Sequence, residues 1–230
     1  MNRNRIEEAI GYTFKDGALL ERAFTHPSAS PSKGGNYQDL EFLGDSVVGF
    51  VTAEKLFLLY PDAGEGKLTK MRACVVSESP LAGAVERLGV ADEMLLGENE
   101  SKHGVYAHAS VMCDLFEAIT AAIYLDGGME EAKAFVLRAL EEELAGAWDA
   151  LRRTDAKSRL NEYAMQKGVS LRYIEEEKRG EQHSPVFRFS VCLGEERMGE
   201  GEGRSKREAQ QLAASRTLEM LAAGKRKNKR

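Results

Sequence analysis

Four acidic side chains lie in two strongly apolar stretches of the first half of the sequence. Glu41 and Asp45 are four residues apart in the first stretch. Asp114 and Glu117 are three residues apart in the second stretch. If both stretches are helical, each pair occupies one face of its helix, because residues three and four apart are neighbours on a helix surface. Each face would then present two carboxylates to a common ligand.

The surroundings of these acids favour a metal ion. A helix that is apolar nearly all round is normally buried, and an ionised carboxylate is costly to bury without a cation or hydrogen-bond donors. No Lys or Arg occurs in residues 34–54 or 103–132. A hard divalent cation with oxygen ligands would compensate the acids, and water bound to it can attack a phosphodiester. The alternative is that each acid is exposed or pairs with a distant Arg. This is common for a single acid, but it explains two spaced pairs less well.

Gly44 and Gly49 lie within the first apolar stretch. Glycine in a helix interior costs roughly 1 kcal/mol relative to Ala, so two of them in one helix call for an explanation. Close approach of a second helix would explain them, and so would simple tolerance.

Composition limits the class of protein. The chain has 230 residues, 43% hydrophobic and 30% charged, which is typical of a folded protein with one large or two ordinary domains. Its cysteines, Cys74, Cys113 and Cys192, form no CxxC pair, so neither a disulfide framework nor a zinc site is expected. No apolar run is long enough to span a bilayer, and residues 1–10 lack the apolar core of a signal peptide. We therefore expect a cytoplasmic protein without a membrane partner.

The two parts of the chain differ in charge. Residues 1–150 contain 13 Lys and Arg against 25 Asp and Glu, whereas residues 151–230 contain 19 against 12. The net charges are therefore −12 and +7, although the whole chain carries only −5. This asymmetry predicts an acidic body joined to a basic module that contacts phosphates.

The periodicity of apolar residues predicts a multidomain fold. We expect an all-α domain over residues 1–147, a linker over 148–155, an α-β-β-β-α domain over 156–223 and a basic tail over 224–230. In the first domain, the helical period covers residues 17–24, 40–60, 80–88, 108–125 and 130–148. In the second domain, helices are expected at residues 157–166 and 205–223, and strands at 171–176, 185–193 and 197–201.

Several segments match those of a known family. The residues LEFLGDSV at 40–47 resemble the signature of ribonuclease III over eight consecutive positions. DLFEA at 114–118 and AIYLDGG at 122–128 resemble the family's second acidic helix. THPS at 25–28 and EGKLTKMRA at 65–73 also resemble family segments. The similarity covers essentially the whole chain, in the family's order of nuclease domain, linker and double-stranded-RNA-binding domain.

This resemblance implies an endoribonuclease that hydrolyses double-stranded RNA with Mg²⁺-activated water, with Mn²⁺ as a substitute ion. It implies 5′-phosphate and 3′-hydroxyl ends, a homodimer with two active centres in one valley, and no small-molecule substrate. Processing of ribosomal RNA precursors and structured transcripts is also implied. The implied metal ligands are Glu41, Asp45, Asp114 and Glu117, with Asp45 and Glu117 as catalytic residues and Glu117 the most critical.

Further positions concern the dimer and the catalytic valley. The resemblance places Glu65 near the valley at the dimer interface. It lets Phe42 pack into the partner subunit, although ordinary core packing explains Phe42 equally well. The family usually has Asn-Glu-Arg where this chain has Tyr37, Gln38 and Asp39. Gln38 therefore replaces an acid that often lines the valley, and Asp39 could restore part of the charge.

The second domain resembles a double-stranded-RNA-binding domain, whose contacts span two minor grooves and the phosphates between them. The resemblance assigns Asn161 and Glu162 to one minor groove, His183 to the next, and Lys206 and Arg207 to the phosphates. For His183 the alternative is a solvated loop histidine. Cations in the first turn of a helix oppose its dipole, so Lys206 and Arg207 fit a helix end that binds an anion.

Other residues around the last helix have structural interpretations. Ser205 and Glu208 fit a capping box, which we favour for both. The family has a third basic residue where this chain has Gln210, which predicts slightly weaker phosphate binding. The small residues that would let the helix lie close to the sheet are Ala209, Ala213 and Ala214.

Two other functional classes fit parts of the sequence. A binding-only protein would need the basic module but not the four acids. A metal-independent helical scaffold, such as a ribosome-assembly or maturation factor, would not need the acids either. The presence of all four acids favours the hydrolase.

Overall fold

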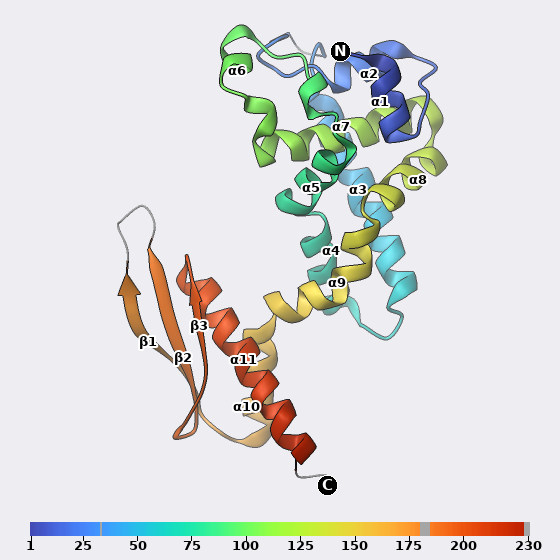
Figure 1. The fold of residues 1–230 in the computed structure, drawn as a ribbon. Coiled ribbons are helices and arrows are strands. Elements are labelled where there is room, and N and C mark those ends of the chain that lie inside the picture. Colours follow the sequence, from blue (N-terminus) through green and yellow to red (C-terminus); the bar gives the residue numbers. More distant parts are fainter. Residues whose placement is uncertain (33, 180–184, 228–230) are drawn as a thin grey trace. The chain divides into compact units, whose positions relative to one another are not determined.

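The computed structural model describes residues 1–32, 34–179 and 185–227. The chain divides into two compact units, Met1–Ala147 and Trp148–Arg230. The first unit is helical, and the second has the order helix, three strands, helix (Figure 1), so the predicted fold class is confirmed. None of the helices in these described ranges combines the length and the apolar character that crossing a membrane requires.

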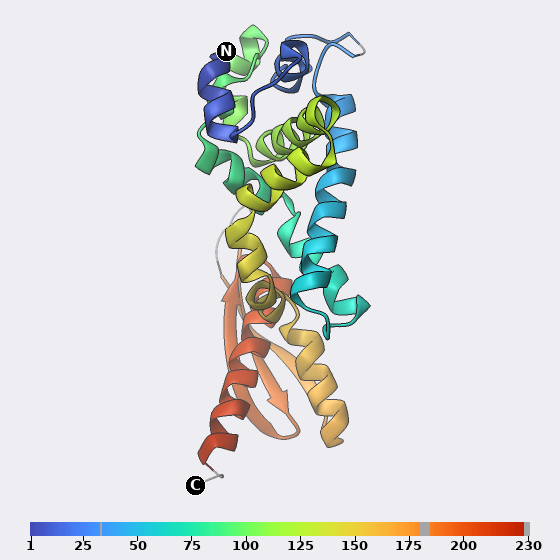
Figure 2. The same cartoon turned by 90° about the vertical axis from the view of Figure 1, so that its right-hand side faces the viewer.

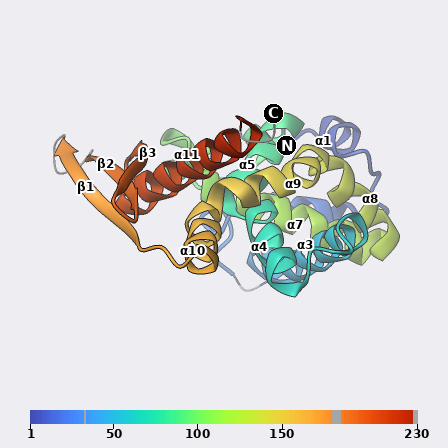
Figure 3. The same cartoon turned by 90° about the horizontal axis from the view of Figure 1, so that it is seen from below.

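The first unit is built around one buried helix, α7 (Ala109–Gly127). Its long apolar side chains, among them Leu115, Phe116 and Ile119, are fully buried. The other helices of this unit are α1 (Arg3–Ile10), α2 (Gly17–Ala23), α3 (Gln38–Leu59), α4 (Glu65–Val75), α5 (Glu78–Leu88), α6 (Glu98–Lys102), α8 (Met129–Ala139) and the start of α9 (Glu141–Thr154). Of these, α2, α3, α5 and α8 contact α7, and α3 and α7 lie side by side in Figures 1 and 3.

The apolar period does not predict three of these helices, and the shortest of them, α6, buries no residue. α1 buries only Ile6 and Ile10, which is too few for a periodic signal, although the Asn2 side chain caps its first turn. α4 buries only Met71 and Val75, and four of its eleven residues are charged. Short helices with two buried residues are fixed by caps and by neighbouring helices, and a pattern search over the sequence misses them.

The second unit consists of α10 (Ala156–Lys167), β1 (Leu171–Arg179), β2 (Val186–Leu193), β3 (Glu196–Gly203) and α11 (Lys206–Lys227). The strands form an antiparallel sheet in the order β1-β2-β3. α11 contacts β2, β3 and α10, and Figure 2 shows it running along the sheet. The predicted strands are all present, and β1 and β3 extend beyond their predicted ends.

Small residues on both sides bring α11 close to the sheet. Ala209, Ala213 and Ala214 are fully buried, as predicted. On the strand side, a Cβ atom added at Gly201 would lie 2.4 Å from the Ala209 carbonyl oxygen. The close approach therefore requires glycine in β3, which the sequence pattern did not indicate.

Two segments expected outside regular structure are helical. α9 continues through Thr154, so most of the expected linker 148–155 belongs to a helix, where the buried Leu151 lies. α11 continues to Lys227, so residues 224–227 of the expected basic tail are also helical. Lys and Arg are good helix formers, and cations near a helix C-terminus interact favourably with its dipole. Residues 228–230 lie outside the described residues.

Candidate functional site

Three of the predicted acids lie beside a close contact between α3 and α7. A Cβ atom added at Gly44 on α3 would lie 1.9 Å from the Glu117 carbonyl oxygen on α7. Close approach is therefore the reason for Gly44. A Cβ atom at Gly49 would meet nothing within 4 Å, so that glycine is simply tolerated. The contact at Gly44 brings the acidic face of α3 up to that of α7.

The structure gathers three of the four acids into one group. One carboxylate oxygen from each of Glu41, Asp114 and Glu117 lies within 4.8 Å of the other two. We call these three residues the acid group. Asp45 lies one helical turn after Glu41 and is exposed, so it borders the group without joining it.

Burial and mutual repulsion oppose ionisation of the acid group. Burial, and after it the charges of the other three acids, raises the pKa of Glu117 from 4.5 to about 8. Burial and the neighbouring acids also raise the pKa of Glu41. Burial raises the pKa of Asp114, although a hydrogen bond from Tyr37 acts in the opposite direction. A divalent cation bound among these carboxylates would favour their ionised forms and reverse the shifts.

The residues present fit a hard divalent ion. The ion pairs of α3 in the described part of the chain use Asp39 and Glu54, not the acid group. The sequence places no Lys or Arg within residues 34–54 or 103–132. Carboxylate oxygens without competing cations are the ligands that Mg²⁺ and Mn²⁺ take in proteins.

The residues flanking the acid group differ in exposure. Gln38 is exposed, and its backbone N–H donates to Asn36 Oδ1 at 3.1 Å. Asp39 pairs with Arg22 at 3.0 Å, so its charge is balanced locally and does not replace the acid missing at Gln38. Phe42 is 80% exposed, which excludes the core-packing alternative.

The structure does not bring Glu65 into the acid group. Glu65 begins α4, which follows the C-terminal end of α3, whereas Glu41 lies in the first turn of α3. Glu65 instead lines a groove of about 560 Å³ formed by α3 and α4. The apolar residues of this groove include Phe50, Phe57 and Leu68.

Tyr37 contacts the acid group, and sequence reasoning assigned it no role. Its hydroxyl donates a hydrogen bond to Asp114 Oδ2 at 3.2 Å. The departure from the family's usual Asn at this position was the available signal, but only the fold shows that Tyr37 reaches α7.

The structure describes two of the three residues of the second unit that are expected to contact RNA minor grooves. Asn161 and Glu162 are both exposed on α10, while Leu160 and Ala164 on its other face are buried. The pair is therefore accessible to a ligand on the outer face of the helix. His183 and its turn, residues 180–184, lie outside the described residues.

The start of α11 is capped as predicted. Ser205 Oγ accepts a hydrogen bond from the Glu208 N–H at 3.1 Å. The Glu208 carboxylate accepts from the Arg204 N–H at 2.7 Å, one residue before the expected partner. Lys206 and Arg207 lie in this first turn and are exposed. The capping interpretation is thus confirmed, and both cations remain accessible.

Two cations near this helix end already have protein partners. Lys206 Nζ lies 2.7 Å from a carboxylate oxygen of Glu175 on β1. Lys157 Nζ donates to Gln210 Oε1 at 2.5 Å. Gln210, which replaces a basic residue of the family pattern, therefore ties α11 to α10.

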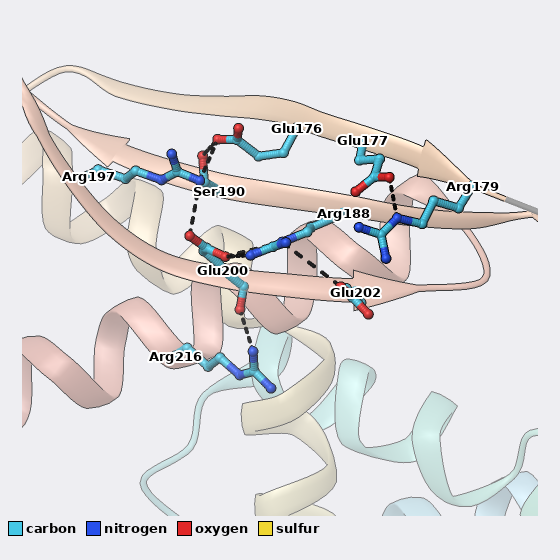
Figure 4. A network of polar contacts seen from close by, with 9 residues as sticks. All are labelled: Glu176, Glu177, Arg179, Arg188, Ser190, Arg197, Glu200, Glu202 and Arg216. Atoms are coloured by element: carbon cyan, nitrogen blue, oxygen red, sulfur yellow. Dashed lines mark hydrogen bonds and ion pairs between the residues drawn. The ribbon is translucent and has the colours of Figure 1, made fainter.

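The face of the sheet turned away from α11 carries a network of paired charges (Figure 4). Arg188 pairs with Glu200 and Glu202. Arg197 pairs with Glu176 and Glu200. Because acids neutralise these arginines, this face is a weaker anion site than the start of α11.

Comparison with known families identifies both units. A family model described as ribonuclease-III-like matches residues 16–144. A model of the double-stranded RNA binding motif matches residues 156–221. The chain belongs to the ribonuclease III family. It is therefore an endoribonuclease that acts on double-stranded RNA, and this part of the predicted function is confirmed.

Similarity to individual ribonucleases III extends over nearly the whole chain. Ribonuclease 3 of Roseiflexus sp. (strain RS-1) is 36% identical over 228 residues, which cover 96% of both chains. Ribonuclease 3 of Symbiobacterium thermophilum is 42% identical over 217 residues, covering 92% of this chain and 91% of the relative.

Solved ribonuclease III structures resemble the first unit. The nuclease domain from Campylobacter jejuni has a TM-score of 0.58 at 38% identity, covering 61% of this chain and 95% of that chain. A second structure of that domain concerns structural flexibility in its region involved in dimer formation. It has a TM-score of 0.59 at 38% identity and covers 62% of this chain and 98% of that chain.

Proposed function

We propose that this ribonuclease III hydrolyses duplex RNA in a Mg²⁺-dependent reaction, in which Mn²⁺ can replace Mg²⁺. Glu41, Asp45, Asp114 and Glu117 hold the ion. The observation that carries the proposal is the meeting of three carboxylates within 4.8 Å. Within the described ranges no Lys or Arg forms an ion pair with these three partly buried acids, and a divalent ion would balance their charge.

Bound Mg²⁺ supplies a water of lowered pKa and a counter-charge for the scissile phosphate. Hydrolysis would join the oxygen of a water molecule to phosphorus and break the bond between phosphorus and the 3′ oxygen, and the proton that the water loses balances the one that the 3′ oxygen gains. The 3′ oxygen takes up a proton, which leaves a 3′-hydroxyl on one product and a 5′-phosphate on the other. Asp45 and Glu117 are the proposed catalytic residues.

We also propose that two copies associate through α3 and the groove beside α4. Phe42, Phe50, Phe57 and Leu58 are exposed on α3, which is costly for an isolated subunit. The nuclease domain from Campylobacter jejuni has a region involved in dimer formation, which supports the association of two copies. A dimer would place two acid groups in one valley, with Glu65 and Gln38 at its margins. Sedimentation of the wild type and of Phe42→Ala tests it, since the variant should dissociate more readily.

In the second unit, we propose that Asn161, Glu162 and His183 contact minor grooves and that Lys206 and Arg207 contact phosphates. The exposure of the two cations at the capped start of α11 supports this assignment. We propose the domain boundaries 1–147 and 156–223, and ribosomal RNA precursors and structured transcripts of the cytoplasm as substrates. No small molecule is expected as a substrate.

The direct test is incubation of a long RNA duplex with the full chain, with Mg²⁺, with Mn²⁺ and with a chelator. A single strand of the same sequence serves as the substrate control. We expect duplex cleavage with either ion, none with chelator, and products whose 5′ ends are degraded by a 5′-monophosphate-dependent exonuclease. Failure of the dimeric protein to cut at any Mg²⁺ concentration would refute the proposal.

A further inference from the structure

Tyr37 links the two helices that carry the acid group. It directly precedes α3, is only 3% exposed, and donates its hydroxyl hydrogen to Asp114 Oδ2. Its backbone carbonyl accepts a hydrogen bond from the Glu41 N–H at 2.8 Å. One residue therefore touches an acid of α7 through its side chain and an acid of α3 through its backbone.

We propose that Tyr37 is a positioning residue that fixes the Asp114 carboxylate, so that its second oxygen is presented to the metal. The inference rests on the proposed function, because it concerns the same metal site. It goes beyond that function, because it assigns a role to a side chain that stands where the family usually has Asn. A ligand whose orientation is fixed before the ion arrives binds it more tightly than a freely rotating one.

The ring of Tyr37 is itself held in place. His26 meets it edge-on, with 5.7 Å between the ring centroids, and the Tyr37 N–H donates to the Thr25 carbonyl at 3.0 Å. The Ser28 N–H donates to His26 Nδ1 at 3.1 Å, and Ser28 Oγ accepts from the Gly97 N–H at 2.9 Å. The THPS segment at residues 25–28, to which the resemblance gave no role, thus packs against Tyr37 and holds its ring in place.

The hydroxyl of Tyr37 is a permanent donor. A phenol is protonated at neutral pH, so the buried Tyr37 hydroxyl donates to Asp114 Oδ2 at 3.2 Å. A hydrogen bond to a charged group is worth about 1.5–3 kcal/mol. Among the described residues, no comparable side-chain donor reaches Glu41 or Glu117. Asp114 is therefore the member of the acid group whose orientation the protein fixes.

The test is Tyr37→Phe, which removes the hydroxyl and keeps the buried ring. Mn²⁺ binding to the full-length dimer is measured without RNA, by electron paramagnetic resonance of the free ion. We expect the variant to bind Mn²⁺ about tenfold more weakly, the scale of effect for a residue that supports a metal ligand. The Mg²⁺ concentration for half-maximal cleavage should rise by a similar factor, while duplex affinity stays unchanged.

Tyr12→Phe is the matched control. Tyr12 also donates its hydroxyl hydrogen to a carboxylate of the first unit, Asp126, at 2.7 Å, but Asp126 is not part of the acid group. This control should lose some stability and keep wild-type Mn²⁺ affinity. Unchanged Mn²⁺ affinity and Mg²⁺ dependence in Tyr37→Phe would overturn the inference, provided that Glu117→Gln loses Mn²⁺ binding. If Glu117→Gln also binds Mn²⁺ normally, the proposed metal site itself is wrong, and the inference fails with it.

Discussion

Gly44 of α3 and Glu117 of α7 lie in direct backbone contact, with only 1.9 Å between a Cβ atom built at Gly44 and the Glu117 carbonyl oxygen. No side chain fits between the two helices at this point. Because Glu117 also belongs to the acid group, the contact that packs the first unit fixes the distance between the proposed metal ligands. Stability and metal binding should therefore change together when this contact is altered.

Gly44→Ala should destabilise the first unit and weaken metal binding. An added methyl group must push α3 away from α7, and overpacking of this kind costs about 1–3 kcal/mol. Denaturant unfolding measures the loss, and Mn²⁺ titration measures the effect on the acid group. Gly49→Ala is the internal comparison, because its Cβ atom would meet nothing within 4 Å. It should leave stability unchanged or raise it by up to about 1 kcal/mol, from better helix propensity. Equal effects of the two substitutions would contradict this role for Gly44.

Glu117→Gln should abolish cutting while leaving duplex binding nearly intact. The amide keeps the shape of the side chain but loses the charge that holds the ion. We expect cleavage to fall by more than about a hundredfold, the upper range for residues that merely support metal ligands. Cleavage assays and filter binding on one duplex separate the two activities. Glu86→Gln, an exposed acid on α5, should behave as wild type. A Glu117→Gln protein that cuts normally would remove Glu117 from the site.

The metal-free protein should lose stability as the pH rises. The pKa of Glu117 is raised by burial and by neighbouring acids from 4.5 to about 8, so between these values the folded state binds more protons than the unfolded state. The free energy of unfolding then falls with increasing pH across this window. Mg²⁺ should restore the free energy of unfolding at the upper end of this pH window, since the ion binds the ionised acids of the folded state.

Urea unfolding in chelator at several pH values measures this dependence. Comparison with Glu117→Gln isolates the share of Glu117, because the pKa of Glu41 and Asp114 is raised as well. The variant should show a shallower decline between about pH 5 and pH 8. An identical decline in both proteins would show that Glu117 does not titrate in this range.

The sequence was sufficient to predict the two pairs of acids, but it could not predict how α3 and α7 bring them together. The spacing of Glu41, Asp114 and Glu117 predicts which face each acid occupies, because helical spacing is local. Which helices cross, and where, depends on tertiary contacts, so Gly44 could be noted as unusual but not assigned a partner. Tyr37 was overlooked for the same reason, since its contact with Asp114 spans 77 residues.

The second unit shows the same limit. Strand alternation and the capping residues Ser205 and Glu208 are local signals, and both are confirmed by the structure. The requirement for Gly201 comes from α11 lying on β3, which no strand pattern contains. The helical continuation of α11 to Lys227 was hidden by its basic composition, which is equally typical of an irregular tail.

Changing Lys206 and Arg207 together to Ala should weaken duplex binding without regard to sequence. The slope of log affinity against log salt should also fall by about 1 for each phosphate that is no longer bound. Arg172→Ala is the control: this exposed cation pairs in register with Cys192, at the opposite end of the sheet from the start of α11. An unchanged salt slope in the double variant would contradict the docking of RNA at this helix end.

Glu175→Gln should act in the opposite direction on the same site. Glu175 holds Lys206 at 2.7 Å and competes with RNA phosphates for it. An exposed ion pair is worth up to about 1 kcal/mol, so duplex affinity should rise by at most about fivefold. Glu196→Gln, at the far end of the sheet, should have little effect. Weaker binding by Glu175→Gln would mean that Glu175 orients Lys206 for RNA and does not compete with it.

The central claim is that the crossing of α3 and α7 builds the metal site of this ribonuclease III. Its most direct test is anomalous diffraction from crystals of the full chain soaked in Mn²⁺. We predict a peak within bonding distance of Glu41, Asp114 and Glu117, with Asp45 reached directly or through water, and no such peak in Glu117→Gln. A peak elsewhere, or none at a Mn²⁺ concentration that supports cleavage, would contradict the claim.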